Sequence, residues 1–147
     1  MQKLSVERSI WIDANRERVW QAITDANEIM QWWSGEDYWE IEALEVGGTI
    51  KFGDPIDLMF ATIAVFDPPH EFTIHWPPQA QYGNLEMFTT YVLEEEDNGT
   101  RVTVTETGFE GLPDDIRQQR YDSTSSGYES VLSGLKHYIE GGRLGGG

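Results

Sequence analysis

The stretch IWIDANRERVWQAITDANEIMQWW, residues 10–33, passes from the periodicity of a strand to that of a helix. Apolar and polar residues alternate up to Ile12, as in a half-buried strand. Beyond it, the apolar side chains of Val19, Trp20 and Ile23 recur at helical spacing, with charged or polar residues between them. The sequence therefore predicts an N-terminal strand followed by a short amphipathic helix.

Two aspartates in the same stretch mark expected helix starts. Asp13 comes just before the first helix, where its side chain would accept a hydrogen bond from a free backbone N–H. Asp25 and Glu28 have the spacing of a capping pair, and the residues that follow include the apolar Ile29 and Trp32. We expect a second short helix there.

Turn-forming residues divide the region after Gly35 into short segments rich in β-branched and aromatic residues. The segments are TIKF, LMFATIAVF, EFTIHW, LEMFTTYVLEEE and TRVTVTETGF. Successive segments of this kind, separated by tight turns, are typical of antiparallel strands joined as a meander. We expect about six such strands.

The last part of the chain returns to helical spacing. Pro113-Asp114-Asp115 is a helix start, and Gly141-Gly142 is the expected end, so the helix would run for roughly 25 residues. A helix of that length crosses a small domain, and a sheet wrapped around it would bury both apolar faces. We expect one domain at residues 1–142 and a flexible glycine-rich tail at 143–147.

Composition excludes several classes of function. The 147 residues contain no cysteine, which excludes disulfides, thiolate zinc sites and cysteine nucleophiles. The formal charge of −16 repels phosphate backbones, so nucleic acid is not an expected partner. No secretory signal and no apolar run long enough for a membrane span is present, so a cytoplasmic protein is expected. The three histidines are not spaced as ligands, and we expect neither a metal nor another cofactor.

Five segments in order resemble one known family: IWIDANRERVWQAITDANEIMQWW, GGTIKF, FDPPHEFTIHW, NGTRVTVTETGF and GYESVLSGLKHYIE. The family comprises proteins similar to the activator of the heat-shock-protein-90 ATPase, within the START-like (SRPBCC) superfamily. In the last segment Gly127-Tyr128 stands where a glycine–tryptophan pair is usual. The resemblance implies an α+β helix-grip fold, in which a curved antiparallel sheet of about six to seven strands grips a C-terminal helix. It also implies an apolar cavity between them.

Strand alternation predicts which side chains face that cavity. One face of three successive strands carries aromatic and aliphatic groups, two hydroxyl-bearing side chains and one carboxylate. Apolar walls with a few polar anchors are typical of ligand cavities, although a plain core uses the same residue types. The candidate ligand-binding residues are Trp33, Phe52, Phe60, Ile63, Trp76, Met87, Tyr91, Glu106, Tyr121, Tyr128 and Leu132.

Glu106 is the candidate with the most specific chemistry. A carboxylate on the inner face near a strand end needs a partner or a raised pKa. It is either a ligand anchor or general acid/base, or the partner of Arg8 on the first strand, or a group solvated at the cavity mouth. Trp33 ends the second short helix, where the fold has its cavity entrance, and it is our candidate for a gate.

Three functions remain open from the sequence. The first is a small-molecule binding protein that holds an apolar, amphipathic or lipid-like ligand. The second is a protein-interaction module of a co-chaperone kind, whose acidic surface would meet a basic partner. The third is a cyclase- or hydratase-type enzyme that uses Glu106 for proton transfer. A monomer or weak dimer is expected.

Overall fold

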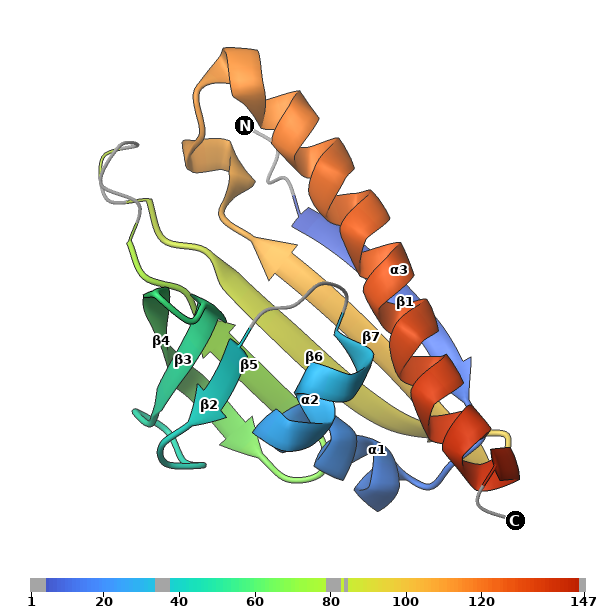
Figure 1. Cartoon of the computed structure of the whole chain (residues 1–147). Helices are drawn as coiled ribbons and strands as arrows, with labels where there is room; N and C mark the ends of the chain where they lie inside the picture. Colours follow the sequence, from blue (N-terminus) through green and yellow to red (C-terminus); the bar gives the residue numbers. More distant parts are fainter. Residues whose placement is uncertain (1–4, 34–37, 79–82, 84, 146–147) are drawn as a thin grey trace.

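A curved antiparallel sheet of seven strands holds a long helix against one face (Figure 1). The computed structural model describes residues 5–33, 38–78, 83 and 85–145, with side chains up to residue 141. The strand order is β1-β7-β6-β5-β4-β3-β2, and every pair is antiparallel. This is the helix-grip fold that the resemblance implied.

The elements have the following bounds. The strands are β1 (Ser5–Ile12), β2 (Tyr38–Ile41), β3 (Thr49–Asp54), β4 (Asp57–Asp67), β5 (Glu71–His75), β6 (Phe88–Glu96) and β7 (Gly99–Thr107). The helices are α1 (Arg16–Thr24), α2 (Ala26–Trp32), a short 3-10 turn η2 (Phe109–Gly111), and α3 (Asp114–Gly145). The order of strand, two short helices, strands and long helix is the predicted one.

The pairing of the first strand with the last places α3. β1 pairs along its whole length with β7, from Ser5 opposite Thr107 to Ile12 opposite Thr100. The chain leaves β7 through η2 and returns as α3, which runs beside β1 in Figure 1. α1 and α2 lie near the C-terminal end of α3 in the same view. Among the described residues, β2, β3, β4 and β5 have few or no contacts with α3, whose contacts with the sheet are mainly with β1.

The predicted strand alternation is confirmed on the three strands that carried it. Phe72 and Ile74 of β5, Tyr91 of β6 and Val104 of β7 are all buried. They belong to one core that also takes in the apolar side of α3, including Leu132 and Leu135. The inner face of the sheet is therefore the face that the period-2 pattern indicated.

Asn15, rather than Asp13, caps α1. The Asn15 Oδ1 atom accepts from the backbone N–H of Arg18 at 2.8 Å, which is the N3 position of the helix. The prediction for Asp13 was wrong because Asp13 lies two residues too early for that geometry. Its backbone N–H instead donates to Glu140 Oε2 on α3. Asp25 caps α2 as expected, accepting from Glu28 N–H at 3.1 Å.

α3 continues past its predicted end. The helix has 32 residues and runs through Gly141 to Gly145. A glycine costs about 1 kcal/mol in a helix relative to alanine, but it does not forbid helical geometry. Contacts one turn earlier hold this end, because Lys136 Nζ bonds both Glu140 and the Trp11 carbonyl at 2.7 Å. The boundary after residue 142 therefore does not coincide with the end of the helix, and the tail stays a prediction.

Candidate ligand-binding cavity

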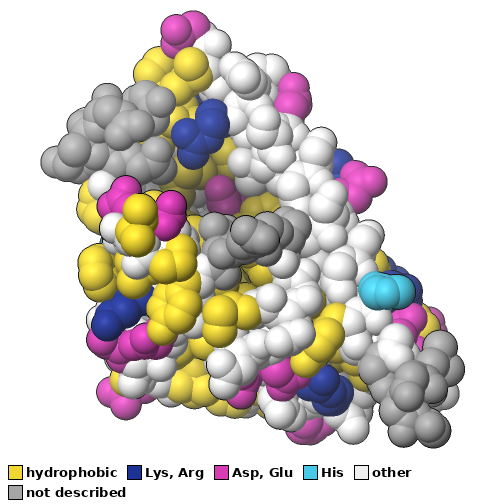
Figure 2. Space-filling view, viewed as in Figure 1, with side chains coloured by type: hydrophobic (Ala, Val, Ile, Leu, Met, Phe, Trp, Pro, Cys, Tyr) yellow, Lys and Arg dark blue, Asp and Glu magenta, His cyan; other side chains and the backbone are white. Residues whose placement is uncertain are grey.

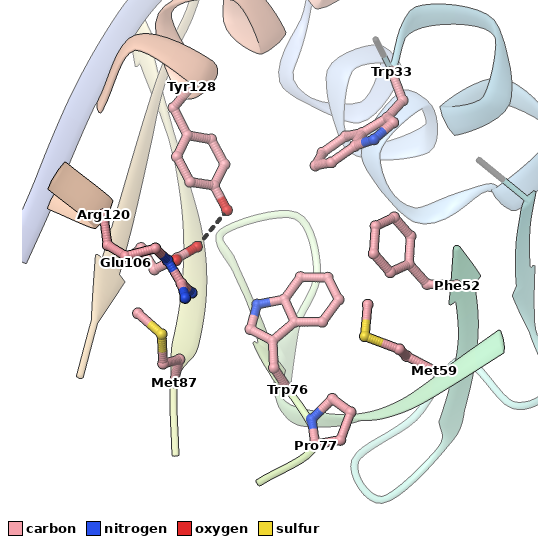
Figure 3. A pocket seen from close by; sticks show the side chains of 9 residues that line it. All are labelled: Trp33, Phe52, Met59, Trp76, Pro77, Met87, Glu106, Arg120 and Tyr128. Atoms are coloured by element: carbon pink, nitrogen blue, oxygen red, sulfur yellow. Dashed lines mark hydrogen bonds between the residues drawn. The ribbon is translucent and has the colours of Figure 1, made fainter. Parts of the chain in front are cut away.

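A cavity of about 430 Å³ lies between the N-terminal half of α3 and the far strands of the sheet. Figure 2 shows the face of the molecule where the surface is hollowed beside α3, and Figure 3 shows the lining from close by. The lining residues are Trp33, Phe52, Met59, Trp76, Pro77, Met87, Glu106, Arg120 and Tyr128. They come from α3, from the end of α2, and from the strands β3, β4, β7 and the segment that joins β5 to β6.

One side of the cavity is an aromatic wall. The ring of Phe52 lies 6.0 Å from Trp33 and 5.3 Å from Trp76, centroid to centroid. Trp39 packs behind them, 4.6 Å from Phe52 and 5.1 Å from Trp33. All these pairs are tilted or edge-to-face, an arrangement that contributes about 0.5–1.5 kcal/mol per pair beyond area burial. The wall is therefore held in shape by its own rings.

The opposite side carries a hydrogen-bonded polar group. The Trp76 indole Nε1–H donates to Thr89 Oγ1 at 2.8 Å, and Thr89 donates to Glu106 Oε1 at 2.8 Å. The Tyr128 hydroxyl donates to the same Glu106 oxygen at 2.7 Å, as the dashed line in Figure 3 shows. β6, β7, α3 and the segment after β5 are thus tied together through Thr89 and the Glu106 carboxylate.

Burial changes the titration of this group. It raises the pKa of the Glu106 carboxyl, although hydrogen bonds from Tyr128 and Thr89 and the charge of Arg120 oppose the change. Burial and the Glu106 charge raise the pKa of Tyr128 well above its ordinary value. The Tyr91 hydroxyl behaves in the same way, for the same two reasons. Both tyrosines therefore stay protonated, and Glu106 titrates at a higher pH than an exposed carboxyl.

The expected ion pair between Arg8 and Glu106 does not form. Arg8 donates from Nε and Nη2 to Ser125 Oγ at 3.0 and 2.8 Å, and lies 3.5 Å from Glu129. In the β1–β7 register Glu106 lies opposite Val6, and Arg8 lies opposite Val104. α3 passes over β1 and supplies nearer partners for the arginine, which the strand register alone could not show.

A smaller cavity of about 250 Å³ adjoins the first. Its lining is Trp33, Glu106, Thr124, Gly127, Tyr128 and Val131. Trp33, Glu106 and Tyr128 line both hollows, so the two form neighbouring parts of one site along α3. This position agrees with the choice of Trp33 as a gate, which remains a prediction.

The structure gathers some of the candidate residues and separates others. The candidates that line the larger cavity are Trp33, Phe52, Trp76, Met87, Glu106 and Tyr128. Ile63, Tyr91 and Leu132 are buried in the core instead, and Tyr121 packs on Phe109. Phe60 is 56% exposed and lies outside the site, because Met59 is the residue opposite Phe52 in the β3–β4 register and Phe60 lies opposite Lys51.

Three residues that line the larger cavity were missed from the sequence. Met59 would have followed from pairing Phe52 across the hairpin at Gly53 to Asp57, had the register been known. Pro77 follows directly after the inward Trp76. Arg120 lies two turns before Tyr128 on α3, which places both on one face of the helix. Helical spacing from Tyr128 was the available signal for Arg120.

Two of the three histidines, His70 and His75, contact side chains of the same chain. His75 lies 3.1 Å from Glu86 and stacks on Phe88, and His70 lies 3.1 Å from Arg16. Within the part of the chain that the structure describes, no three His, Cys, Asp or Glu side chains are grouped to hold a metal ion. The helices described here include none with both the length and the apolar character to cross a membrane.

Solved structures with the same architecture come from several bacteria. A Mesorhizobium loti protein has a TM-score of 0.75 and 16% identity, over 93% of this chain and 97% of its own. A Staphylococcus saprophyticus protein has a TM-score of 0.73 and 25% identity, over 95% and 93% of the two chains. The Aha1 dimer of Colwellia psychrerythraea has a TM-score of 0.71 and 20% identity, over 91% and 94%. No curated protein matches the sequence.

The family match covers most of the chain. The family described as "Activator of Hsp90 ATPase homolog 1-like protein" matches residues 13–140, from the residue after β1 to the last turns of α3. This range includes every residue that lines the cavity and nearly every element of the fold. The chain therefore belongs to the family of Activator of Hsp90 ATPase homolog 1-like proteins, within the START-like superfamily.

Proposed function

We propose that this protein binds an apolar or amphipathic small molecule, of a lipid-like kind, in the cavity between α3 and the sheet. The observation that carries the proposal is the cavity itself, with a volume of about 430 Å³, an aromatic wall and one polar end. Small-molecule sites are typically concave, largely apolar and supplied with a few placed polar groups.

Packing supports the same proposal. Protein interiors are close-packed and contain few voids larger than a water molecule. The core of this protein includes many fully buried side chains, among them Phe72, Leu93 and Leu132. The hollow opens to the surface beside this well-packed core, so its lining is accessible to a ligand.

Native mass spectrometry of the purified protein, with organic extraction of bound material, tests the proposal. We expect a reproducible small-molecule adduct that denaturation releases. Gly127→Leu should reduce the adduct, because Gly127 lines the smaller cavity and a Cβ there would meet no atom within 4 Å. Gly141→Leu is the matched control, since a Cβ at this helical glycine also meets nothing within 4 Å but lies outside the cavity. Equal adducts in both variants would argue against this site.

A second candidate function is proton transfer on a ligand held in the same cavity. The observation that favours it is the partly buried Glu106 carboxyl with a raised pKa, beside the Tyr128 hydroxyl. A substrate identified by extraction would have to lose its turnover in Glu106→Gln. Full turnover in that variant would remove the acid–base role.

The remaining expectations stay predictions. A co-chaperone-like role would appear as co-purification with a protein that high salt weakens, since the chain carries a charge of −16. A monomer or weak dimer, and a cytoplasmic location, are likewise proposed on the sequence. A dimer is known for the Colwellia psychrerythraea protein.

A further inference from the structure

We infer that the ligand presents a neutral hydroxyl group to the polar end of the cavity, where it donates a hydrogen bond to Glu106 and accepts one from Arg120. The inference rests on the proposed function and specifies the class of ligand: an uncharged amphiphile with an apolar body and an alcohol or phenol head. Its basis is the direction of the hydrogen bonds and the balance of charge at this end.

The indole of Trp76 fixes the direction of the hydrogen bonds. An indole N–H can only donate, so Thr89 Oγ1 accepts from Trp76 and has its own proton available for Glu106. The Tyr128 hydroxyl has one proton, and its shortest acceptor is also Glu106, at 2.7 Å. Both hydroxyl groups therefore donate to the Oε1 atom of the carboxylate.

The second oxygen of Glu106 is left for a ligand. Oε1 accepts the bonds from Thr89 and Tyr128, whereas Oε2 has no hydrogen-bond partner among the described residues. The carboxylate lines both the larger and the smaller cavity. Oε2 is not one of the buried side-chain atoms that lack a partner, so it is open to the cavity, and a ligand that displaces water there removes a hydrogen bond. A donor on the ligand would restore that bond.

Arg120 supplies the complementary group. Its side chain lines the same cavity, and Figure 3 shows it beside Glu106. It makes no hydrogen bond or 4.0 Å ion pair to any residue in the described part of the chain, although its charge lowers the pKa of Glu106. A guanidinium has five N–H donors and no acceptor. A ligand atom that accepts a hydrogen bond would find these donors available.

The charges at this end disfavour an ionic head group. A carboxylate on the ligand would meet the like charge of Glu106 and the field of a chain with net charge −16. An ammonium group would meet Arg120. The opposite charges of Glu106 and Arg120 balance each other, so the site has no net charge that would attract an ion. A neutral head group also avoids the cost of removing a charge from water. A hydroxyl group satisfies both because it donates and accepts at one atom.

The apolar body of the ligand would lie against the opposite wall. In Figure 3 Glu106, Arg120 and Tyr128 lie on one side, while Trp33, Phe52 and Met59 lie across the cavity. This separation of polar and apolar lining predicts one orientation for an amphiphile.

Isothermal titration calorimetry with four probes tests the inference on the native protein. The probes are 1-octanol, its isomer 1-methoxyheptane, octanoate and octylamine. The two isomers have the same atoms and differ in whether the oxygen carries a proton. We expect 1-octanol to bind about tenfold more tightly than 1-methoxyheptane, as one hydrogen bond to a charged group implies. We expect octanoate and octylamine to bind more weakly than 1-octanol.

A pair of charge-matched variants locates the effect. Glu106→Gln keeps an oxygen for Thr89 and Tyr128 but places an NH₂ donor where Oε2 was, so the advantage of 1-octanol over its isomer should fall to about twofold or less. Glu129→Gln removes the same charge from the outer side of α3, where Glu129 is exposed and faces Arg8. It should keep the full difference between the isomers.

Other outcomes separate this inference from the proposed function. Equal affinity for both isomers would overturn the hydroxyl assignment and leave the apolar cavity as a binding site. Tighter binding of octanoate or octylamine would overturn it as well, in favour of an ionic ligand. Failure of every probe to bind would overturn both the inference and the proposed cavity function.

Discussion

Thr89 joins the sheet to the polar end of the cavity. It is 1% exposed, and its single hydroxyl accepts from the indole of Trp76 and donates to Glu106. Thr89→Val has nearly the same shape but leaves the indole N–H without its acceptor. We expect a loss of about 1–3 kcal/mol in the free energy of unfolding, measured by urea denaturation.

The control for this prediction is Thr105→Val on β7. Thr105 is half-buried on the outer face, opposite Thr90 and Glu7 in the register. Its replacement should change the free energy of unfolding by about 0.5 kcal/mol or less. Equal effects of the two replacements would mean that the Thr89 hydroxyl group has no special role.

The raised pKa of Glu106 determines how its contribution to the free energy of unfolding changes with pH. Burial raises its folded-state pKa, so the folded state holds the proton more tightly than the unfolded state does. The stability that this group contributes is therefore complete below the ordinary carboxyl pKa and is lost as the pH rises through the raised folded pKa. Glu106→Gln does not titrate and lacks that loss.

Urea denaturation of both proteins across a pH series checks this sign. The free energy of unfolding of Glu106→Gln, relative to the native protein, should increase as the pH rises from the ordinary carboxyl range toward neutrality. Glu129→Gln, which removes one exposed negative charge, is the control for the change in net charge. If the Glu106→Gln difference is constant with pH, the burial of Glu106 does not raise its pKa.

At the residue scale, the sequence predicted on which face of the sheet the Glu106 side chain lies, but it did not predict which groups bond to that side chain. Alternation along one strand was enough to place Glu106 on the inner face, because the period of a strand is local. Its partners come from β6 and α3, and their position depends on how far α3 slides along the sheet. No pattern in the sequence encodes that offset, which is why Arg8 was given the wrong partner.

At the scale of elements, two glycines of α3 have opposite roles. A Cβ at Gly127 would meet no atom within 4 Å, whereas a Cβ at Gly134 would lie 2.8 Å from the carbonyl oxygen of Trp32. The first glycine leaves space beside the cavity, and the second lets α3 approach the end of α2. Both residues are helical, so the intrinsic gain from replacing glycine by alanine is the same.

The two alanine replacements should therefore change stability in opposite directions. Gly127→Ala should raise the free energy of unfolding by about 0.5–1 kcal/mol, since alanine favours the helix. Gly134→Ala should lower it, because the backbone of Trp32 must move. Thermal unfolding of both proteins checks the pair. A gain in both would mean that α3 does not pack tightly on α2.

The helices and strands could be predicted from local sequence patterns, whereas the end of α3 depends on contacts between distant segments. Strands and helices were recognised from periodicity and turn residues, and the fold followed from their order. The end of α3 was misplaced because Gly141 and Gly142 carry a strong local stop signal. Contacts of Lys136 with Trp11 and Glu140 hold the helix at that point, and these are contacts between distant segments.

At the scale of the whole molecule, the tryptophans near the N-terminus divide between core and cavity. Trp20 packs on Phe66 and Phe72, with ring centroids 5.7 and 6.1 Å away. Trp32 is buried and donates to the Ala22 carbonyl at 2.8 Å. Trp33, the next residue, lines the cavity. Two consecutive tryptophans therefore have different roles: Trp32 packs in the core, and Trp33 forms part of the aromatic wall.

The shape of the sheet explains why a hollow remains. α3 packs most extensively on β1, at one edge of the sheet, and reaches β6 and β7 through the Tyr128 hydroxyl. β3 and β4 lie at the far side of the sheet, and there Phe52 and Met59 face the cavity instead of the helix. The sequence predicted the lining from residue type, but whether the space was filled depended on the curvature of the sheet.

Methyl NMR of the methionines tests the central claim most directly. Met59 and Met87 line the cavity, whereas Met30 lies on α2 outside it and is 36% exposed. Titration of methyl-labelled protein with 1-octanol should shift the Met59 and Met87 signals saturably and leave the Met30 signal in place. Unchanged Met59 and Met87 signals, or an equal shift of Met30, would contradict binding in the cavity between α3 and the sheet.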